Sequence, residues 1–334
     1  MLTADLPWFK HCFEHIESSY RSGRLAHGIL VAAPDGSGKT IFAETLVKSL
    51  FCRESHSQLA SPCNQCKSCH LIDAGTHPDF HLVERLVDNK GKQKSSIGID
   101  QIRQLTAKLT DQAQLDGWRV ALITSVSAMT TASFNALLKT LEEPGDKTLL
   151  ILLCDNLQKV PATIRSRCQI LQPELKTSIS KPWIMEKAGE SEAVVSEALR
   201  NCYNAPLSAL NYIQQDGHST QQSLYQSLDQ VLQNQLTPSE FLQSVPVSDN
   251  EMWDALGNYF YSASLLAMGT NKEQLNRANY QQLPDKLIFN LYSKIVDYKR
   301  AQFSGSNLQS KLQLQAILIQ WFEAGRKIIN ISKA

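Results

Sequence analysis

The sequence lacks an excess of either sign of charge and lacks a long apolar run. Its 334 residues include 33 lysines and arginines against 32 aspartates and glutamates, which leaves a formal net charge of +1. This balance excludes a protein whose whole surface contacts nucleic acid, although a local basic patch is compatible with it. No segment approaches the ~20 apolar residues that cross a bilayer, and Met1 to Lys10 contain no charged leader followed by an apolar stretch. We therefore expect a soluble, cytoplasmic protein.

The cysteines do not have the distribution of a disulfide framework. Four of the eight lie between Cys52 and Cys69, in a polar segment with too few apolar residues to build a core of its own. The other four are scattered in apolar settings, at Cys12, Cys154, Cys168 and Cys202. This distribution indicates a metal site.

The clustered cysteines have the spacing of a closed zinc site. They follow the pattern C-x10-C-x2-C-x2-C, at Cys52, Cys63, Cys66 and Cys69. A ferredoxin-type iron–sulfur cluster would require a further cysteine and proline, and Asp73 stands at that cysteine's place. The nearby His56 and His70 are expected to be solvated loop residues, and four free thiols are the alternative to a metal. Four thiolates leave no open position, so the predicted zinc is structural.

Several apolar runs predict a parallel sheet. A chain of this length exceeds one ordinary core, so two or three domains are expected. Short apolar segments bounded by turn residues predict buried strands over 27–33, 118–123 and 148–154. A further strand is expected over 79–84, and residues 169–175 are expected to close the sheet. Apolar residues at helical spacing predict a packing helix over Trp8 to Tyr20 and another over Ile99 to Leu109.

The segment after the first predicted strand has the pattern of a phosphate loop. The residues Ala33-Pro-Asp-Gly-Ser-Gly-Lys-Thr40 connect that strand to a predicted helix. In such a loop Lys39 reaches the β- and γ-phosphates, Thr40 holds magnesium, and the backbone around Gly36 and Gly38 surrounds the phosphates. The first glycine of the motif is replaced by Ala33, and Asp35 adds a negative charge. The pattern predicts that Gly36, Gly38, Lys39 and Thr40 bind ATP or ADP; an ordinary glycine turn before a helix is the alternative.

Catalytic carboxylates are missing where an active phosphate-loop ATPase carries them. In such enzymes the strand corresponding to Trp118–Ile123 ends in Asp-Glu, which holds magnesium and activates water. This strand ends in Thr124-Ser125, which we interpret as a strand end followed by an N-cap. A hydroxyl cannot take a proton from water at neutral pH as a carboxylate does. The sequence therefore predicts slow or absent hydrolysis.

The stretch from Asn135 to Cys168 carries the most specific pattern. Apolar residues at helical spacing precede Pro144-Gly145, which predicts that a helix stops at Glu143. After the buried strand 148–154, the segment Ile164–Cys168 places Arg165 and Arg167 beside a serine.

These residues resemble a known family. The helix end Leu-Leu-Lys-Thr-Leu-Glu-Glu-Pro, followed by Pro-Ala-Thr-Ile-Arg-Ser-Arg-Cys, is similar to the bacterial clamp-loader ATPases. In that family the Ser-Arg-Cys segment carries an arginine finger that acts on a neighbouring subunit's nucleotide. The resemblance implies this role in trans for Arg167, with Arg165 or a surface salt bridge as the alternatives. It extends from about Arg24 to Cys168 and is mostly compositional beyond.

The resemblance also implies a domain plan. Residues 1–172 would form an α/β AAA+ domain with a five-stranded parallel sheet and an inserted zinc module at about 52–70. A small helical lid would occupy 173–210, opened by Pro182 and broken by Gly189 and Pro206, with Leu207 where the family has a nucleotide-sensing arginine. An all-helical collar domain for oligomerisation would occupy 211–334, where apolar residues recur at helical spacing.

The function implied by the resemblance is assembly. The chain would join other subunits in a hetero-oligomeric ring that loads the sliding clamp onto primed DNA, as part of the DNA-directed DNA polymerase holoenzyme, a nucleotidyltransferase complex. No independent catalysis is expected of it. The alternatives are an ATPase active by itself, favoured by Lys39 and Thr40, and a DNA-binding module made by the cysteine cluster and the lysines of the loop 88–96. Those lysines, Lys90, Lys92 and Lys94, are more typical of a solvated loop.

Overall fold

The computed structural model describes residues 6–54, 59, 61–87, 91, 93–110, 113–115, 117–215, 217–244, 249–267, 283–303 and 309–332. The chain divides into two compact units, Met1–Gln214 and Gln215–Ala334. The predicted division into three domains stays a prediction, since the first unit contains both the sheet and the helices assigned to a lid.

The first unit is built on the predicted five-stranded parallel sheet. Its strands are β1 (Gly28–Ala32), β2 (Phe80–Val83), β3 (Arg119–Ile123), β4 (Thr148–Cys154) and β5 (Gln169–Leu171), in the order β2-β3-β4-β1-β5. All four pairings are parallel. The last strand ends at Leu171, earlier than predicted, because Pro173 has no N–H for a ladder and Glu174 donates instead to the carbonyl of Trp8. The predicted fold class is confirmed.

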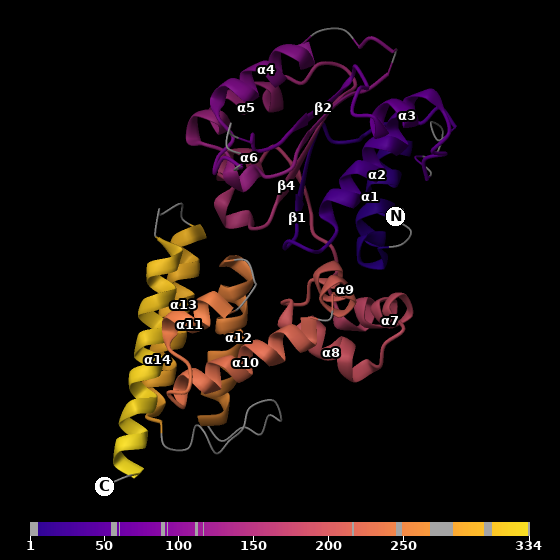
Figure 1. Ribbon diagram of the computed structural model, residues 1–334. Helices are drawn as coiled ribbons and strands as arrows, with labels where there is room; N and C mark the ends of the chain where they lie inside the picture. The colour runs from indigo at the N-terminus through magenta and orange to yellow at the C-terminus, as the bar shows by residue number, and fades with distance from the viewer. Residues whose placement is uncertain are drawn as a thin grey trace. The chain divides into compact units, whose positions relative to one another are not determined.

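Helices cover both faces of this sheet (Figure 1). The helices α1 (Lys10–Arg21) and α2 (Lys39–Phe51) lie on one face, and α4 (Ile99–Thr110) and α5 (Thr131–Glu142) lie on the other. Because successive side chains of a strand point to opposite faces, Ile29 and Val31 join the first core while Leu30 and Ala32 join the second. Burial on both sides explains why β1 and β4 are apolar except for Thr148 at the start of β4.

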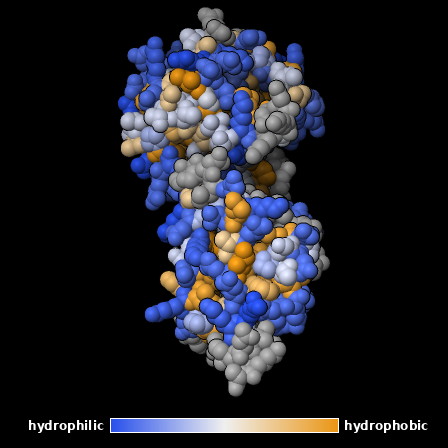
Figure 2. Space-filling view, turned by 60° about the vertical axis from the view of Figure 1, so that its left-hand side comes forward, coloured by the Kyte–Doolittle hydropathy of each residue, from blue (hydrophilic) through white to orange (hydrophobic). Residues whose placement is uncertain are grey.

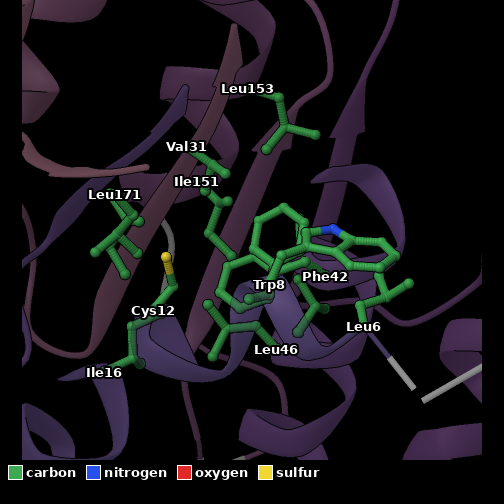
Figure 3. Close-up of a cluster of buried hydrophobic side chains, with 14 of the residues drawn as sticks. Leu6, Trp8, Cys12, Ile16, Val31, Phe42, Leu46, Ile151, Leu153 and Leu171 are labelled. Carbon is green, nitrogen blue, oxygen red and sulfur yellow. The ribbon is translucent and has the colours of Figure 1, made fainter. Parts of the chain in front are cut away.

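Aromatic side chains fill the first core. A 3-10 helix, η2 (Pro7–Phe9), brings Trp8 and Phe9 onto α2, where the rings of Phe9 and Phe42 stack with centroids 4.6 Å apart. Figure 3 shows Trp8 and Phe42 among Leu46, Ile151 and other apolar side chains from the sheet and from α1. The Trp8 Nε1 donates a hydrogen bond of 2.7 Å to the carbonyl of Ser37. The N-terminal segment is thereby fastened to the loop that precedes α2.

Helix α5 ends as predicted. Its N-cap Thr130 accepts a hydrogen bond from the Ser133 N–H, and its last residue is Glu142, with Glu143 at the C-cap. Three short helices lie at the carboxyl edge of the sheet or just before β5: η3 (Val126–Ala128), η4 (Leu157–Lys159) and α6 (Ala162–Arg165).

Three helices complete the first unit: α7 (Thr177–Ala188), α8 (Glu192–Asn201) and α9 (Pro206–Gln214). Gly189 caps α7 with φ +70°, and Pro206 begins α9, as their residue types predict. The prediction that Pro182 opens this region was wrong, since Pro182 lies inside α7. Burial of Trp183 and Ile184 stabilises the helix across the proline, so packing outweighs the lost backbone hydrogen bond.

In the second unit every element described is helical. Its helices are α10 (Gly217–Leu232), α11 (Pro238–Ser244), α12 (Asp249–Ala267), α13 (Asp285–Phe303) and α14 (Ser310–Ser332). They enclose an aromatic core in which Trp253 stacks on Tyr298 and Trp321 Nε1 donates to the carbonyl of Leu228. Hydrophobic side chains also reach the surface, as the face in Figure 2 shows, and in this unit they include Phe289, Leu312 and Ile319. No helix in the described ranges is long and apolar enough to span a membrane.

Candidate functional site

The residues predicted to form a phosphate loop lie between β1 and α2. Two of its glycines have left-handed backbone conformations, Gly36 with φ +73° and Gly38 with φ +89°, which side-chain-bearing residues rarely adopt. Gly38 is the N-cap of α2, so the first N–H groups of that helix adjoin the loop. Backbone N–H groups at a helix N-terminus are the donors that an anion requires.

The charged residues of this loop bind each other. The Lys39 Nζ pairs with the carboxylate of Asp35, four residues earlier, although the Lys39 side chain is only 9% exposed and that of Asp35 is 90% exposed. Thr40 is exposed at the start of α2. An incoming phosphate would therefore have to compete with Asp35 for the lysine.

Helix α9 covers part of the loop. The Leu207 N–H donates a 2.8 Å hydrogen bond to the Gly36 carbonyl. A Cβ placed on Gly36 would lie 1.8 Å from the Ser208 Oγ, and one on Gly38 would meet the side chains of Leu6 and Leu207. Leu207, the residue at the family's sensing-arginine position, thus contacts the loop through its backbone and an apolar side chain. Nothing in the sequence pattern signals Ser208.

Hydroxyl groups end β3, as the sequence shows. Thr124 donates its N–H to the Val83 carbonyl, and Ser125 occupies the N-cap position of η3. Ser125 therefore has the predicted N-cap position, but its side chain makes no capping hydrogen bond.

A carboxylate that sequence reasoning missed lies at the end of the neighbouring strand. Asp155 follows β4, which pairs with β1 in register Ala32 to Cys154, so it lies beside the phosphate loop. Burial raises the pKa of Asp155, but the hydrogen bond from Ser127 and the charges of Lys159 and Lys39 outweigh it, and the net pKa is lowered. This carboxylate is therefore ionised and already engaged by the Ser127 hydroxyl. Its signal in the sequence is only its place after a buried strand.

Arg167 lies between α6 and β5, next to the sheet. Its Nη2 is 2.7 Å from the Glu142 Oε1, and its Nη1 donates to the Thr163 carbonyl at 2.9 Å. The side chains of Arg167 and Glu142 are 35% and 49% exposed. Arg165 is also exposed, at the last position of α6. The structure thus brings Arg167 to the surface and supplies a carboxylate partner that the sequence did not identify.

The four clustered cysteines come together. Cys52 follows α2, Cys63 and Cys66 precede α3 (Lys67–Asp73), and Cys69 lies on it. Their sulfur atoms lie within 4.8 Å of one another. A tetrahedral zinc ion with Zn–S bonds of ~2.3 Å spaces its sulfurs by about 3.8 Å, so the cluster fits such an ion. The backbone N–H of Cys66 points to the Cys63 sulfur at 3.3 Å, and that of Cys63 to the Cys52 sulfur at 3.3 Å.

Two of the clustered thiols have opposite pKa shifts. Burial and the neighbouring sulfurs raise the pKa of the Cys69 thiol, whereas burial of Cys66 is outweighed by hydrogen bonds from the backbone and from the neighbouring cysteines, which lower its pKa. His70 is exposed, as expected, but it lies on α3 and not in a loop, while His56 lies outside the described residues. Lys90 and Lys92 also lie outside them, so the structure does not describe the proposed basic loop as a whole.

Comparison with known proteins supports the family resemblance. A sequence model of the family described as "DNA polymerase III, delta subunit" matches residues 9–176. DNA polymerase III subunit delta-prime of Escherichia coli is 34% identical over 224 residues, which cover 66% of this chain and 65% of that protein. The Haemophilus influenzae protein of the same name is 31% identical, over 75% of this chain and 73% of its own length. The chain belongs to the DNA polymerase III delta-prime family.

Other relatives of this family extend the match. The Pseudomonas aeruginosa delta-prime subunit is 28% identical over 89% of this chain and 92% of its own. Among solved structures, a DNA polymerase III gamma subunit-related protein from Thermotoga maritima covers 96% of this chain and 99% of its own, with a TM-score of 0.50 and 17% identity. At that identity the likeness shows the fold alone. The family resemblance drawn from the helix end and the Ser-Arg-Cys segment is thereby confirmed.

Proposed function

We propose that this chain is a clamp-loader subunit of the DNA polymerase III holoenzyme, acting in the cytoplasm, and that it helps place the sliding clamp on primed DNA without turning over ATP itself. The proposed absence of ATP turnover rests on the contacts of the phosphate loop and on the residues that end β3. Lys39 is paired with Asp35, Gly36 is covered by Ser208, and β3 ends in hydroxyl groups. These features disfavour ATP hydrolysis by the chain itself. We propose that the chain contributes to the loader by assembling with the other subunits.

Nucleotide binding through Gly36, Gly38, Lys39 and Thr40 stays a prediction. The left-handed glycines and the helix N-terminus support it. The competition from Asp35 and the contacts from α9 oppose it. We propose that ATP or ADP, where it binds, remains intact, because no carboxylate follows β3 to activate water.

We propose that Arg167 serves as an arginine finger toward ATP held by a neighbouring subunit. Its position before β5, its partial exposure and its Ser-Arg-Cys context support this role. A guanidinium delivered there would stabilise the charge that develops on a γ-phosphate. An arginine finger accelerates hydrolysis by ~10³ or more, whereas a surface salt bridge contributes at most ~1 kcal/mol to stability.

The test is Arg167→Ala in a loader reconstituted from all its subunits. The variant chain should fold and join the complex, while ATP hydrolysis stimulated by DNA and clamp falls by ~10³, as for the loss of a finger. Arg165→Ala is the matched control and should retain the stimulated rate. Unchanged ATPase and clamp-loading rates with Arg167→Ala would show that the residue is structural.

We propose a structural zinc ion at Cys52, Cys63, Cys66 and Cys69. It would cross-link a segment with few apolar residues, and four protein ligands leave no position for a substrate. The cluster is joined to the sheet domain through α2, where Lys48 pairs with Asp73 of α3.

We propose that the helical unit 215–334 joins the chain to the other subunits of the ring. Exposed apolar side chains on α13 and α14, Phe289, Leu312 and Ile319 among them, support an assembly role. The sliding clamp and primed DNA would be contacted through the complex as a whole.

A further inference from the structure

Two adjacent glutamates end helix α5, which is an unfavourable place for negative charge. The C-terminal end of a helix carries a partial negative charge, so a carboxylate there is destabilising unless a cation neutralises it. Glu142 is the last residue of α5 and Glu143 is its C-cap. The cation that neutralises Glu142 is Arg167, which lies outside α5. The Glu142 Oε1 is 2.7 Å from the Arg167 Nη2.

The same contact restrains Arg167. Both terminal nitrogens of its guanidinium are held by its own chain: Nη2 by Glu142, and Nη1 by the Thr163 carbonyl at 2.9 Å and the Ser166 Oγ at 3.3 Å. Arg165, two residues earlier, takes part in no ion pair within the described residues. Among the described residues, the ion pair with Glu142 therefore distinguishes Arg167, to which the finger role is assigned, from Arg165.

We propose that Glu142 is a positioning residue that holds Arg167 in the free subunit and gives it up to the γ-phosphate of a neighbouring subunit's ATP. This inference rests on the proposed role of Arg167. The exchange is favourable because a triphosphate carries several negative charges against one on the carboxylate. It is also reversible: the pair is partly exposed, and such pairs contribute at most ~1 kcal/mol, about a fivefold change in an equilibrium constant.

The restraint is testable in the isolated full-length chain. Glu142→Gln preserves size and removes the charge, and Glu143→Gln is the matched control. The rate at which an arginine-specific dicarbonyl reagent modifies Arg167 would be followed by mass spectrometry, with Arg165 as the internal reference. Glu142→Gln should raise the Arg167 rate up to about fivefold and leave the Arg165 rate unchanged. Equal Arg167 rates in Glu142→Gln and the parent chain would overturn the restraint.

The consequence for function is testable in the reconstituted loader. Glu142→Gln should lower the ATP concentration for half-maximal hydrolysis, measured without DNA or clamp, by up to about fivefold. It should have no effect when Arg167 is already alanine, and Glu143→Gln should have none in either background. An effect of Glu142→Gln that persists with Arg167→Ala would mean that Glu142 acts on the fold, and would overturn the proposal.

The two tests fail separately. If Arg167→Ala leaves the loader's ATPase intact, the finger role is lost, while the modification rates still report whether Glu142 holds Arg167. If the finger role stands and the modification rates are equal, only the restraint by Glu142 is lost.

Discussion

Replacing Gly325 with alanine should destabilise the helical unit. Gly325 lies on α14 where that helix meets the end of α10. A Cβ at Gly325 would lie 1.5 Å from the carbonyl oxygen of Leu232 and 2.5 Å from its carbon. Both are backbone atoms, so no side-chain rotation relieves the clash, and the two helices must separate. The hydrogen bond from Trp321 Nε1 to the Leu228 carbonyl joins the same two helices and would be strained as well.

The magnitude follows from two opposed terms. Overpacking of a closed contact costs ~1–3 kcal/mol, with the upper end expected where backbone must move. Alanine gains ~1 kcal/mol over glycine in helix propensity, which leaves a net loss of ~1–2 kcal/mol. Gly257 on α12 is the matched control, because its nearest neighbours would be 3.7 and 3.9 Å from a Cβ, which is ordinary contact. Gly257→Ala should therefore stabilise the same unit, by ~0.5–1 kcal/mol.

Calorimetry of the full chain separates the two variants. For a domain near 100 residues, 1 kcal/mol shifts the midpoint by ~4–8 °C, so Gly325→Ala should lower the melting temperature of the helical unit by roughly 5–15 °C and Gly257→Ala should raise it. Hydrogen exchange along α14 would locate the loss. A Gly325→Ala chain as stable as the parent would refute the close approach of α14 to α10.

Three further predictions concern the first unit. Metal analysis should find one zinc per chain, lost in Cys66→Ser and retained in Cys202→Ser; full zinc in the Cys66 variant would contradict the site. ATP turnover by the isolated chain should be far below the ~10 per second typical of enzymes and unchanged by Lys39→Ala, and a rate near that value would refute our interpretation of the β3 end. Burial lowers the pKa of His77 below its ordinary 6.5, so the unfolded chain binds more protons and stability falls as pH drops below 6.5 through the folded pKa. His77→Gln should reduce this slope of melting temperature with pH, and an unchanged slope would rule out His77 as its source.

Local patterns of the sequence determined most of the fold. The sequence predicted all five strands. The inner strands β1, β3 and β4 have the clearest apolar runs, because helices cover both faces of an inner strand. The edge strands β2 and β5 are shorter and partly exposed. Pro144-Gly145 predicted the end of α5, because neither residue continues a helix. The cysteine spacing predicted that four sulfurs meet, because C-x10-C-x2-C-x2-C is the ligand pattern of a closed zinc site.

Only the tertiary structure decided which distant residues share an environment. Pro182 has the local features of a helix start, and the packing of Trp183 and Ile184 places it inside a helix instead. Neither Ser208 over Gly36 nor Glu142 beside Arg167 has a signal in the sequence, because no period or spacing links residues on separate elements. The sequence by itself therefore determined the family, the sheet and the cluster of four cysteines. The three-dimensional contacts decided how the phosphate loop is covered and which carboxylate holds the arginine, since both depend on the packing of elements far apart in the chain.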